Sequence, residues 1–376
     1  MSQIETFERL PLPLASLPQA LQRFCNPDGP MPARMMAAKG LVPVKGSDQI
    51  TMLAQLAHDA VAEVKAAADK TLRSLPEAVM LPACEAALPA AVLDLIADLF
   101  DDKQEMLSRL VANTATHDTT VERIARSAGE LLAERIAVNE TRLLGAPRII
   151  EALYKNRNTR MSTADRLVEL AARNGLELTG IPAFKEHVEA LQGQLIPEPS
   201  EEPLPQDQTF ARTVAADDAN AEDNVFEEDA TGVEQVREKF KPLSMLMAEL
   251  SKSEKIRMAQ VGTKAARMLL VRDINKQVAY ASISSPQTTA QEAAEIAKSK
   301  EVSEEILRYI GNKKDWVKSG EVKHNLVFNP KTPTGISMRF LGHMRADELR
   351  HLSRSRNVSA QIRSLAANWA ARKEKG

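Results

Sequence analysis

The last 64 residues carry the residue types best suited to holding a charged partner. They contain 14 Lys and Arg, and nine of these form a candidate binding face: Lys313, Lys314, Lys318, Lys323, Arg339, Arg345, Arg350, Arg354 and Arg356. Cations that line a groove can neutralise phosphates, with Tyr309 or Trp316 as platforms on which bases stack. The same charges can also keep the surface soluble and contact an acidic protein. No reading helix or RNA-binding signature decides between the two kinds of partner.

The histidines and cysteines give weaker signals. His343 and His351, with His324 upstream, are close enough in sequence to suggest a metal site or a pH-sensing pair, but no carboxylate or cysteine is spaced to complete a site. Cys84 lies next to Glu85 among small residues, whereas a reactive thiol is normally flanked by cations. We therefore expect surface histidines and a buried, unreactive Cys84.

The sequence offers no constellation for catalysis. The motifs GxxxxGK[ST], GxGxxG, HExxH and CxxC are all missing from it. One run of carboxylates is typical of a solvated helix end rather than of an acid/base pair or a cation site: Asp98, Asp101, Asp102 and Glu105. The sequence thus predicts no enzyme, with no catalytic, cofactor-binding or metal-binding residues. The rival is an enzyme whose site is assembled across repeats.

Composition predicts an all-α fold. Hydrophobic residues make up 44% of the chain and aromatic residues only 4%, a balance typical of helices packed on small aliphatic side chains. The two cysteines, Cys25 and Cys84, are too few for a disulfide framework and indicate reduced thiols. The N-terminus does not read as a signal peptide, and no run approaches roughly 18 apolar residues. We expect a cytoplasmic protein that does not insert into membranes.

Helical periodicity and recurring turns point to repeated helical units. A turn with Asn and Thr followed by a helix occurs at 113–116 and at 156–163, and the pair Pro286 and Thr288 returns 44 residues later as Pro330 and Thr332. Helix–turn units that recur in this way are the mark of an α-solenoid. The C-terminal apolar faces include these residues: Ile306, Met338, Leu341, Met344, Val358, Ile362, Leu365 and Trp369.

An acidic, proline-rich stretch is the clearest boundary in the sequence. Residues 198–229 contain 11 acidic residues and only one basic residue, Arg212. Such a segment has too little apolar surface to offset the entropy of ordering, so we expect a disordered linker, either a plain spacer or a strap that folds back on the basic face. The predicted order is a capping segment (1–45), a helical-repeat module (46–193), the linker (194–233) and a basic helical-repeat module (234–376).

The charges of the two halves are opposite in sign. Residues 1–230 hold 22 Lys and Arg against 36 Asp and Glu, whereas residues 231–376 hold 27 against 15. The overall net charge of −2 conceals this split. Such an asymmetry favours electrostatic contact with a partner, or between the halves.

The turn NPKTP at 329–333, with its following helix, and the pattern LRxLxxxxxV at 349–358 resemble the leucine-rich-repeat-variant and HEAT-like α-solenoid repeats of bacteria. Residues 148–176 and 243–366 further resemble an uncharacterised bacterial protein family of this layout. The resemblance implies two HEAT-like modules that bind partners, and it brings no catalytic residues. We expect a non-enzymatic scaffold or adaptor that binds proteins, the alternative being a nucleic-acid-binding protein that uses the basic C-terminal module.

Overall fold

The computed structural model describes residues 7–219, 225–228 and 234–373. These residues form 24 α-helices, three short 3-10 helices and one two-stranded antiparallel sheet. The α-helices run from six residues (α10) to 14 residues (α14 and α24). The fold is all-α with a repeat-like helical architecture, as the sequence predicts.

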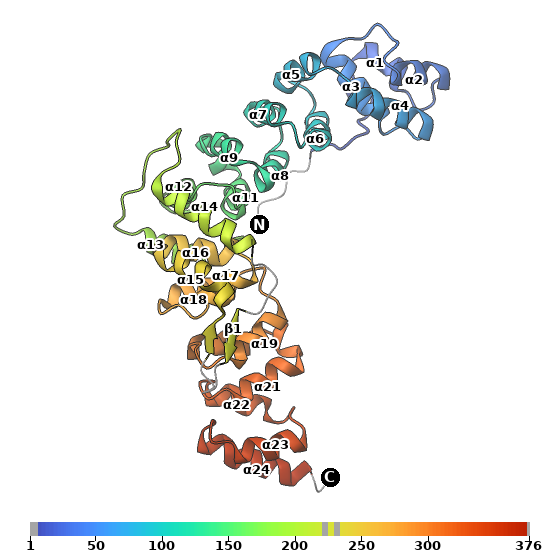
Figure 1. Cartoon of the computed structure of the whole chain (residues 1–376). Coiled ribbons are helices and arrows are strands. Elements are labelled where there is room, and N and C mark those ends of the chain that lie inside the picture. The colour runs from blue at the N-terminus through green and yellow to red at the C-terminus, as the bar shows by residue number, and fades with distance from the viewer. Residues whose placement is uncertain (1–6, 220–224, 229–233, 374–376) are drawn as a thin grey trace. The chain divides into compact units, whose positions relative to one another are not determined.

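The chain divides into two compact units, Met1–Thr159 (unit 1) and Arg160–Gly376 (unit 2). The helices of unit 1 follow one another along the chain (Figure 1). They are η1 (Leu14–Ser16), α1 (Gln19–Cys25), α2 (Met31–Ala38), α3 (Gly46–Leu56), α4 (Ala62–Arg73), α5 (Glu77–Glu85), α6 (Ala90–Leu99), α7 (Gln104–Ala112), α8 (Asp118–Ser127), α9 (Glu130–Ala137), α10 (Glu140–Gly145) and α11 (Pro147–Lys155). Helices α1 and α2, in the predicted capping segment 1–45, pack on α3, and α2 also packs on α4.

Unit 2 contains the remaining helices and the sheet. They are α12 (Met161–Arg173), α13 (Phe184–Leu191), α14 (Pro205–Asp218), β1 (Phe226–Glu228), β2 (Glu234–Val236), η2 (Glu238–Phe240), α15 (Lys241–Glu249), α16 (Lys252–Val261), α17 (Lys264–Leu270), α18 (Lys276–Ser284), α19 (Ala290–Lys298), α20 (Glu304–Asn312), η3 (Trp316–Lys318), α21 (Gly320–Phe328), α22 (Thr334–Leu341), α23 (Ala346–Arg354) and α24 (Ala360–Lys373).

Both units are built from two rows of stacked helices. In unit 1, α5, α7 and α9 contact one another in order, while α6, α8 and α11 form a second row. In unit 2, α16, α18 and α20 form one row, and α17, α19 and α21 form the other. Each short amphipathic helix buries its apolar face against its neighbours, and in unit 2 the buried residues of the two rows form one core.

An asparagine recurs at the turns between stacked helices and explains the recurring sequence pattern. Asn113, Asn156 and Asn329 each follow the last residue of a helix, where the side-chain amide donates two hydrogen bonds to an earlier turn. The acceptors are the carbonyls of Cys84 and Ala86 (both 2.8 Å), of Ala125 (2.9 Å) and Ala128 (2.8 Å), and of Ala297 (2.7 Å) and Ser299 (2.8 Å). These asparagine clamps satisfy carbonyls that a helix leaves open at its C-terminal end.

The threonine of the same turn completes the motif. The backbone N–H groups of Thr116, Thr159 and Thr332 donate to the carbonyls of the three clamp asparagines. All three threonines are buried, so the turn forms part of the packed interior rather than a surface loop. The repeat signal in the sequence is thus a hydrogen-bonding device that joins successive helical units.

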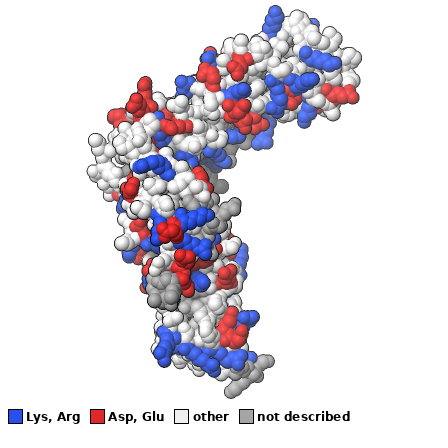
Figure 2. All heavy atoms as spheres, in the orientation of Figure 1, with Lys and Arg blue, Asp and Glu red and all other residues white. Residues whose placement is uncertain are grey.

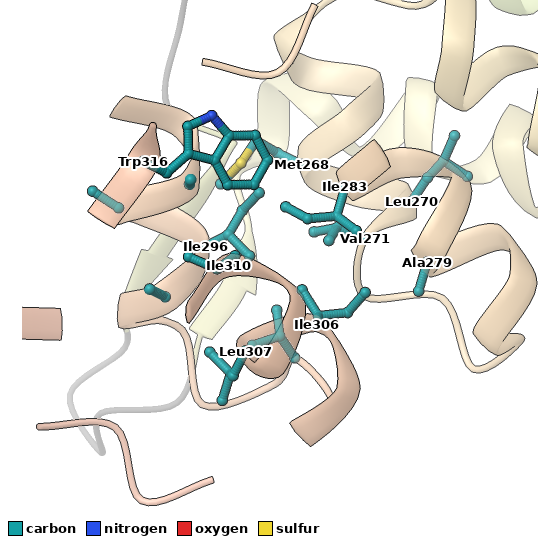
Figure 3. Packing of buried hydrophobic residues seen from close by; sticks show 14 of the residues in the cluster. Met268, Leu270, Val271, Ala279, Ile283, Ile296, Ile306, Leu307, Ile310 and Trp316 are labelled. Atoms are coloured by element: carbon teal, nitrogen blue, oxygen red, sulfur yellow. The ribbon is translucent and has the colours of Figure 1, made fainter. Parts of the chain in front are cut away.

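The core of unit 2 gathers aliphatic side chains from both rows. Figure 3 shows Ile283, Ile296, Ile306 and Ile310 close together with Trp316, all of them buried. Of the predicted C-terminal core residues, these are buried: Ile306, Leu341, Met344, Val358 and Ile362. The prediction is wrong for Met338 and Trp369, which are 42% and 37% exposed because they lie at the edges of the apolar faces of α22 and α24.

The prediction of a disordered linker over 194–233 is wrong for residues 205–218, which form α14. This helix contacts α12 and α15, and Phe210 and Val214 bury their side chains in the core of unit 2. The guanidinium of the fully buried Arg257 lies over the ring of Phe210, 4.8 Å from its centroid. Phe210, Val214 and the cation–π contact with Arg257 anchor this helix, although the composition of the segment predicts a flexible spacer.

Two of the acidic residues of α14 also point inward. Asp207 accepts hydrogen bonds from the backbone N–H of Ser162 (2.7 Å) and from its hydroxyl (2.9 Å), at the start of α12. Asp217 does the same at the start of α17. Carboxylates are favoured at helix N-termini, where the peptide N–H groups are open. These contacts join α14 to α12 and α17 within unit 2.

Residues 220–224 and 229–233 of the predicted linker lie outside the described residues. Strands β1 and β2 pair in antiparallel register, with Phe226 opposite Val236. The side chain of Glu234 accepts from Arg272 (2.9 Å) and from Ser299 (2.7 Å), and the Arg272 guanidinium lies 3.6 Å from the centroid of Phe226. These contacts join the two strands to the turns that follow α17 and α19, and helical periodicity does not predict the strands.

None of the helices in the described part of the chain is long and apolar enough to cross a membrane.

Candidate binding surface

Three aromatic side chains form a row along unit 2. Tyr280 of α18 and Tyr309 of α20 meet edge to face, with ring centroids 5.6 Å apart and ring planes at 90°. Tyr309 in turn lies 5.9 Å from Trp316 of η3. Since the whole sequence contains only three tyrosines and two tryptophans, this aromatic row (Tyr280, Tyr309 and Trp316) gathers most of the Tyr and Trp residues of the protein.

Local structure fixes the row in place. Helix α18 begins after Asn275, whose side chain accepts from the N–H of Gln277 (3.0 Å). On α20, Ile306 and Ile310 are buried, which leaves Tyr309 half-buried at the edge of the apolar face. Trp316 is only 7% exposed, so it packs against Tyr309 from the protein interior. Helices α18 and α20 are neighbours in one row, and this contact brings their tyrosines together.

A shallow pocket of about 410 Å³ lies beside the two tyrosines. Its lining residues come from α18, α20 and the turn after α20: Tyr280, Glu305, Arg308, Tyr309, Asn312 and Lys313. This volume is near the lower end of the range for small-ligand sites, roughly 300–1,000 Å³. The surface that lines the pocket is mainly apolar, and the lining also includes the polar groups of Glu305, Arg308, Asn312 and Lys313.

The charges around the pocket are partly paired. Lys276 binds Glu305 (2.7 Å) and Arg308 binds Glu304 (2.5 Å), both on the exposed surface. Lys313 is different: its ammonium lies 5.8 Å from the centroid of Tyr309 and 5.6 Å from that of Trp316. Within the described residues, no carboxylate lies within ion-pair distance of this ammonium. Lys313 is thus a positive charge above an aromatic wall, available to an anionic group of a partner.

The hydroxyl of Tyr280 remains a hydrogen-bond donor at neutral pH. Burial raises the pKa of Tyr280, and the neighbouring Tyr309 and Glu186 raise it further. Asn312 accepts from Arg339 through Oδ1 (3.4 Å), so its amide nitrogen can donate to a ligand. The pocket therefore combines aromatic surface with several donors.

The nine residues of the predicted binding face lie on several elements. Lys313 alone among them lines the pocket. Lys318 pairs with Asp315 (2.7 Å), and Arg345 pairs with Asp347 (3.4 Å) and Glu348 (3.8 Å). Lys323 is half-buried on α21. Arg339 donates to the carbonyl of Gly311.

The other four cations of the predicted face, Lys314, Arg350, Arg354 and Arg356, are exposed. Arg350 and Arg354 belong to α23, and Arg356 follows it. Figure 2 shows Lys and Arg gathered at the end of unit 2 that α23 and α24 form. Of the predicted face, Lys313 thus lies at the aromatic row, and Arg350, Arg354 and Arg356 form a separate cationic end surface.

The histidines are arranged around aromatic rings. His324 stacks on Phe328 with ring centroids 4.3 Å apart, and His351 stacks on the same ring at 5.6 Å. His343 lies near Phe340 instead. Among the described residues there is no group of three His, Cys, Asp or Glu side chains that could hold a metal ion.

Three side chains that the sequence suggests as possible reactive groups, Cys84, Asp98 and Glu105, are either buried or ion-paired. Cys84 is fully buried, as the sequence predicts, and this burial raises the pKa of its thiol to about 11. Asp98 pairs with Arg123 (3.3 Å) and Glu105 pairs with Arg109 (3.0 Å), both at the surface. These contacts fit a solvated, ion-paired helix end.

A larger pocket of about 560 Å³ in unit 1 is a weaker candidate. The two carboxylates of its wall, Asp94 and Asp98, both bind Arg123. Thr120 also donates to Asp94 (2.7 Å). Groups committed to one another in this way offer less to a ligand than the unpaired ammonium of Lys313.

Sequence reasoning named Tyr309 and Trp316 as stacking platforms but missed Tyr280 and Asn312. Tyr280 is the fifth residue of α18 and Tyr309 the sixth of α20, so no matching repeat position in the sequence marks Tyr280. No protein-family model, curated protein or solved structure matches the chain.

Proposed function

We propose that this protein is a non-enzymatic, cytoplasmic scaffold or adaptor that binds partner proteins through the surface of unit 2. The observation that carries the proposal is the aromatic row beside the 410 Å³ pocket, with Lys313 above it. Tyrosine and tryptophan are among the residue types enriched at protein-binding hot spots. Stacked helical repeats present extended surfaces that can bind a partner, as in HEAT-like repeats. Two free, buried cysteines accord with a reducing compartment.

Site-specific photo-crosslinking tests this proposal. A photoreactive phenylalanine in place of Tyr280 in the full chain keeps the aromatic ring at the pocket. In a nuclease-treated lysate of cells that carry the protein, we expect a discrete protein adduct at this position. The matched control is the same group in place of Leu131, which is 79% exposed in unit 1. Adducts that are identical at both positions, or that vanish with nuclease, would refute protein binding at the aromatic row.

A second candidate function is nucleic-acid binding by the cationic end surface. The observation in its favour is the gathering of exposed Arg350, Arg354 and Arg356 at the end of unit 2. Binding through phosphates would weaken steeply with salt, and reversing these charges would reduce the salt slope. The triple variant Arg350→Glu/Arg354→Glu/Arg356→Glu should then lose most of its affinity for a single-stranded oligonucleotide, whereas Tyr280→Ala should retain it. Affinity that is independent of salt would exclude this function.

A further inference from the structure

The chemistry of the pocket identifies a class of partner, an inference that rests on the proposed protein-binding function. We propose that the aromatic row binds an extended, proline-rich peptide segment that carries acidic residues. The polyproline II helix is left-handed and has no internal hydrogen bonds, so its carbonyls need donors from a receptor. Domains that recognise such peptides use grooves lined by aromatic side chains. Ring geometry, hydrogen-bonding capacity and charge each favour this occupant.

The ring geometry favours proline over a nucleic-acid base. Tyr280 and Tyr309 stand at 90° to each other, so they cannot sandwich a flat base between parallel faces. The Lys313 ammonium lies near the rings of Tyr309 and Trp316, and Trp316 is nearly buried. Base stacking requires an open aromatic face. A puckered, compact proline ring fits instead into the angle between two perpendicular rings.

The hydrogen-bonding capacity of the wall matches a peptide rich in proline. The donors are the hydroxyl of Tyr280, the amide nitrogen of Asn312 and the ammonium of Lys313. The carboxylate in the pocket, Glu305, is already bound by Lys276. A proline residue offers a carbonyl acceptor and no backbone N–H, so it needs donors and no acceptors from its receptor.

The charge of the site specifies the residues that flank the prolines. Lys313 is unpaired, and Lys314 beside it is exposed, whereas Arg308 and Lys276 are bound to glutamates. The nearby Asp315 is paired with Lys318, so the turn after α20 carries net positive charge at this end of the pocket, whereas Glu186 acts on Tyr280. An acidic side chain of the peptide would meet this positive charge, next to the prolines that occupy the Tyr280–Tyr309 angle.

The test uses the full-length protein and a fluorescent peptide of about twelve residues built from Pro-Pro-Glu repeats. Binding is followed by anisotropy at moderate salt. The comparison peptides have the same length and are built from Gly-Ser-Glu, which keeps the charge, and from Pro-Pro-Ser, which keeps the conformation. We expect Pro-Pro-Glu to bind tightest and Gly-Ser-Glu to bind at least about tenfold more weakly. Equal affinity for Pro-Pro-Glu and Gly-Ser-Glu would overturn the proposal, since charge alone would then explain binding.

Variants of the pocket separate its contributions. Tyr280→Ala should weaken Pro-Pro-Glu binding about tenfold or more, and Tyr280→Phe, which keeps the ring but not the donor, should weaken it less. Lys313→Glu should weaken Pro-Pro-Glu much more than Pro-Pro-Ser, because Pro-Pro-Ser loses only a hydrogen-bond donor whereas Pro-Pro-Glu also loses an opposite charge. The control is Ile274→Ala, because Ile274 is fully exposed just before α18. Circular dichroism and the melting temperature establish that each variant folds.

The outcomes also separate this inference from the proposed function. If Tyr280→Ala binds the peptide as the unchanged protein does, the inference is wrong. A protein adduct that still forms at position 280 would then leave the proposed function intact. If single-stranded oligo(dT) binds and Tyr280→Ala abolishes that binding, the aromatic row is a nucleic-acid site, and both the inference and protein binding at this row are overturned.

Discussion

Asp217, the second-last residue of α14, accepts hydrogen bonds from the backbone N–H and the hydroxyl of Thr263, the N-cap residue of α17. Its Oδ2 lies 2.7 Å from the backbone nitrogen and its Oδ1 lies 2.5 Å from the hydroxyl oxygen. The side chain is fully buried, and the N–H of Ala266 also donates to it (3.2 Å). A carboxylate from a segment that composition describes as a linker thus caps a helix 46 residues further along the chain.

The first prediction concerns this contact. Asp217→Ala should lower the free energy of unfolding by about 2–4 kcal/mol, because it leaves buried donors of α17 without their charged acceptor. Denaturant unfolding measures the loss, and hydrogen exchange should show faster exchange in α14 and α17. Asp218→Ala removes the same charge from an exposed neighbour and should change stability by at most about 1 kcal/mol. Equal effects of the two substitutions would contradict the capping role.

The second prediction concerns the asparagine clamp at Asn329. Asn329→Ala should destabilise the protein by about 2–4 kcal/mol, since the buried carbonyls of Ala297 and Ser299 both lose a donor. Asn329→Asp should be at least as harmful near neutral pH, because it replaces the donor by a charged acceptor that faces two carbonyls. Thermal unfolding compares both with Asn357→Ala, an exposed control expected to lie within about 0.5 kcal/mol of the unchanged protein. A melting temperature unchanged by Asn329→Ala would rule out a structural clamp.

The sequence predicts the fold class and the location of the repeats because both depend on local patterns. Periodic apolar residues determine that short helices form, and the recurring Asn and Thr turns mark where they end. The reason for the asparagine does not appear in the sequence, because its acceptors lie about 30 residues earlier, on another helix. Tertiary partners of this kind explain why the repeats are visible while the hydrogen bonds that join them are not.

The linker shows the opposite case, in which composition points away from the structure. Its many acids and prolines indicate disorder when they are counted together. Residues 205–218 are ordered because Phe210 and Val214 reach the core and Asp207 and Asp217 find helix N-termini. The order of this segment depends on where each residue lies along the helix, which a count of charges does not capture. The same holds for the site: the count of cations pointed to a broad basic face, whereas the pocket depends on the pairing of two tyrosines.

The third prediction concerns the two buried thiols. Burial, with the nearby Asp59, raises the pKa of Cys25 to about 12 from its ordinary value of 9.0, and burial raises that of Cys84 to about 11. Native protein at about pH 8 should therefore react very slowly with a disulfide reagent, and both thiols should react once denaturant unfolds the chain. Fast labelling of either cysteine in the native protein would contradict the burial that the structure shows.

The same pKa shifts predict a direction for stability at high pH. The folded protein holds each thiol proton more tightly than the unfolded chain does, so this contribution is fully present below about pH 9. It is lost as the pH rises from about 9 toward 11 and 12, where the unfolded thiols ionise first. Denaturant unfolding at several pH values should show a smaller decline over this window for Cys25→Ala/Cys84→Ala than for the unchanged protein. An identical decline would show that other groups account for all of it.

The last prediction concerns the close approach of α20 and α22. Gly311 lies where a Cβ atom would be 2.7 Å from Cγ2 and 3.1 Å from Cδ1 of Ile336, a buried residue. Gly311→Ala gains up to about 1 kcal/mol of helix propensity but overpacks the interface at a cost of about 1–3 kcal/mol. We therefore expect a net destabilisation of about 1 kcal/mol. Gly335→Ala, on α22 with no neighbouring atom within 4 Å of its Cβ position, should instead stabilise the protein by up to about 1 kcal/mol.

A double-mutant cycle decides whether the clash with Ile336 is the cause. Ile336→Ala alone should cost about 2–5 kcal/mol, because it leaves a cavity against α20. In that background there is space at position 311, so Gly311→Ala should become neutral or stabilising. The two substitutions are then expected to couple by about 1–2 kcal/mol, measured from the unfolding free energies of the four proteins. Strict additivity would mean that the contact between α20 and α22 is looser than these distances imply.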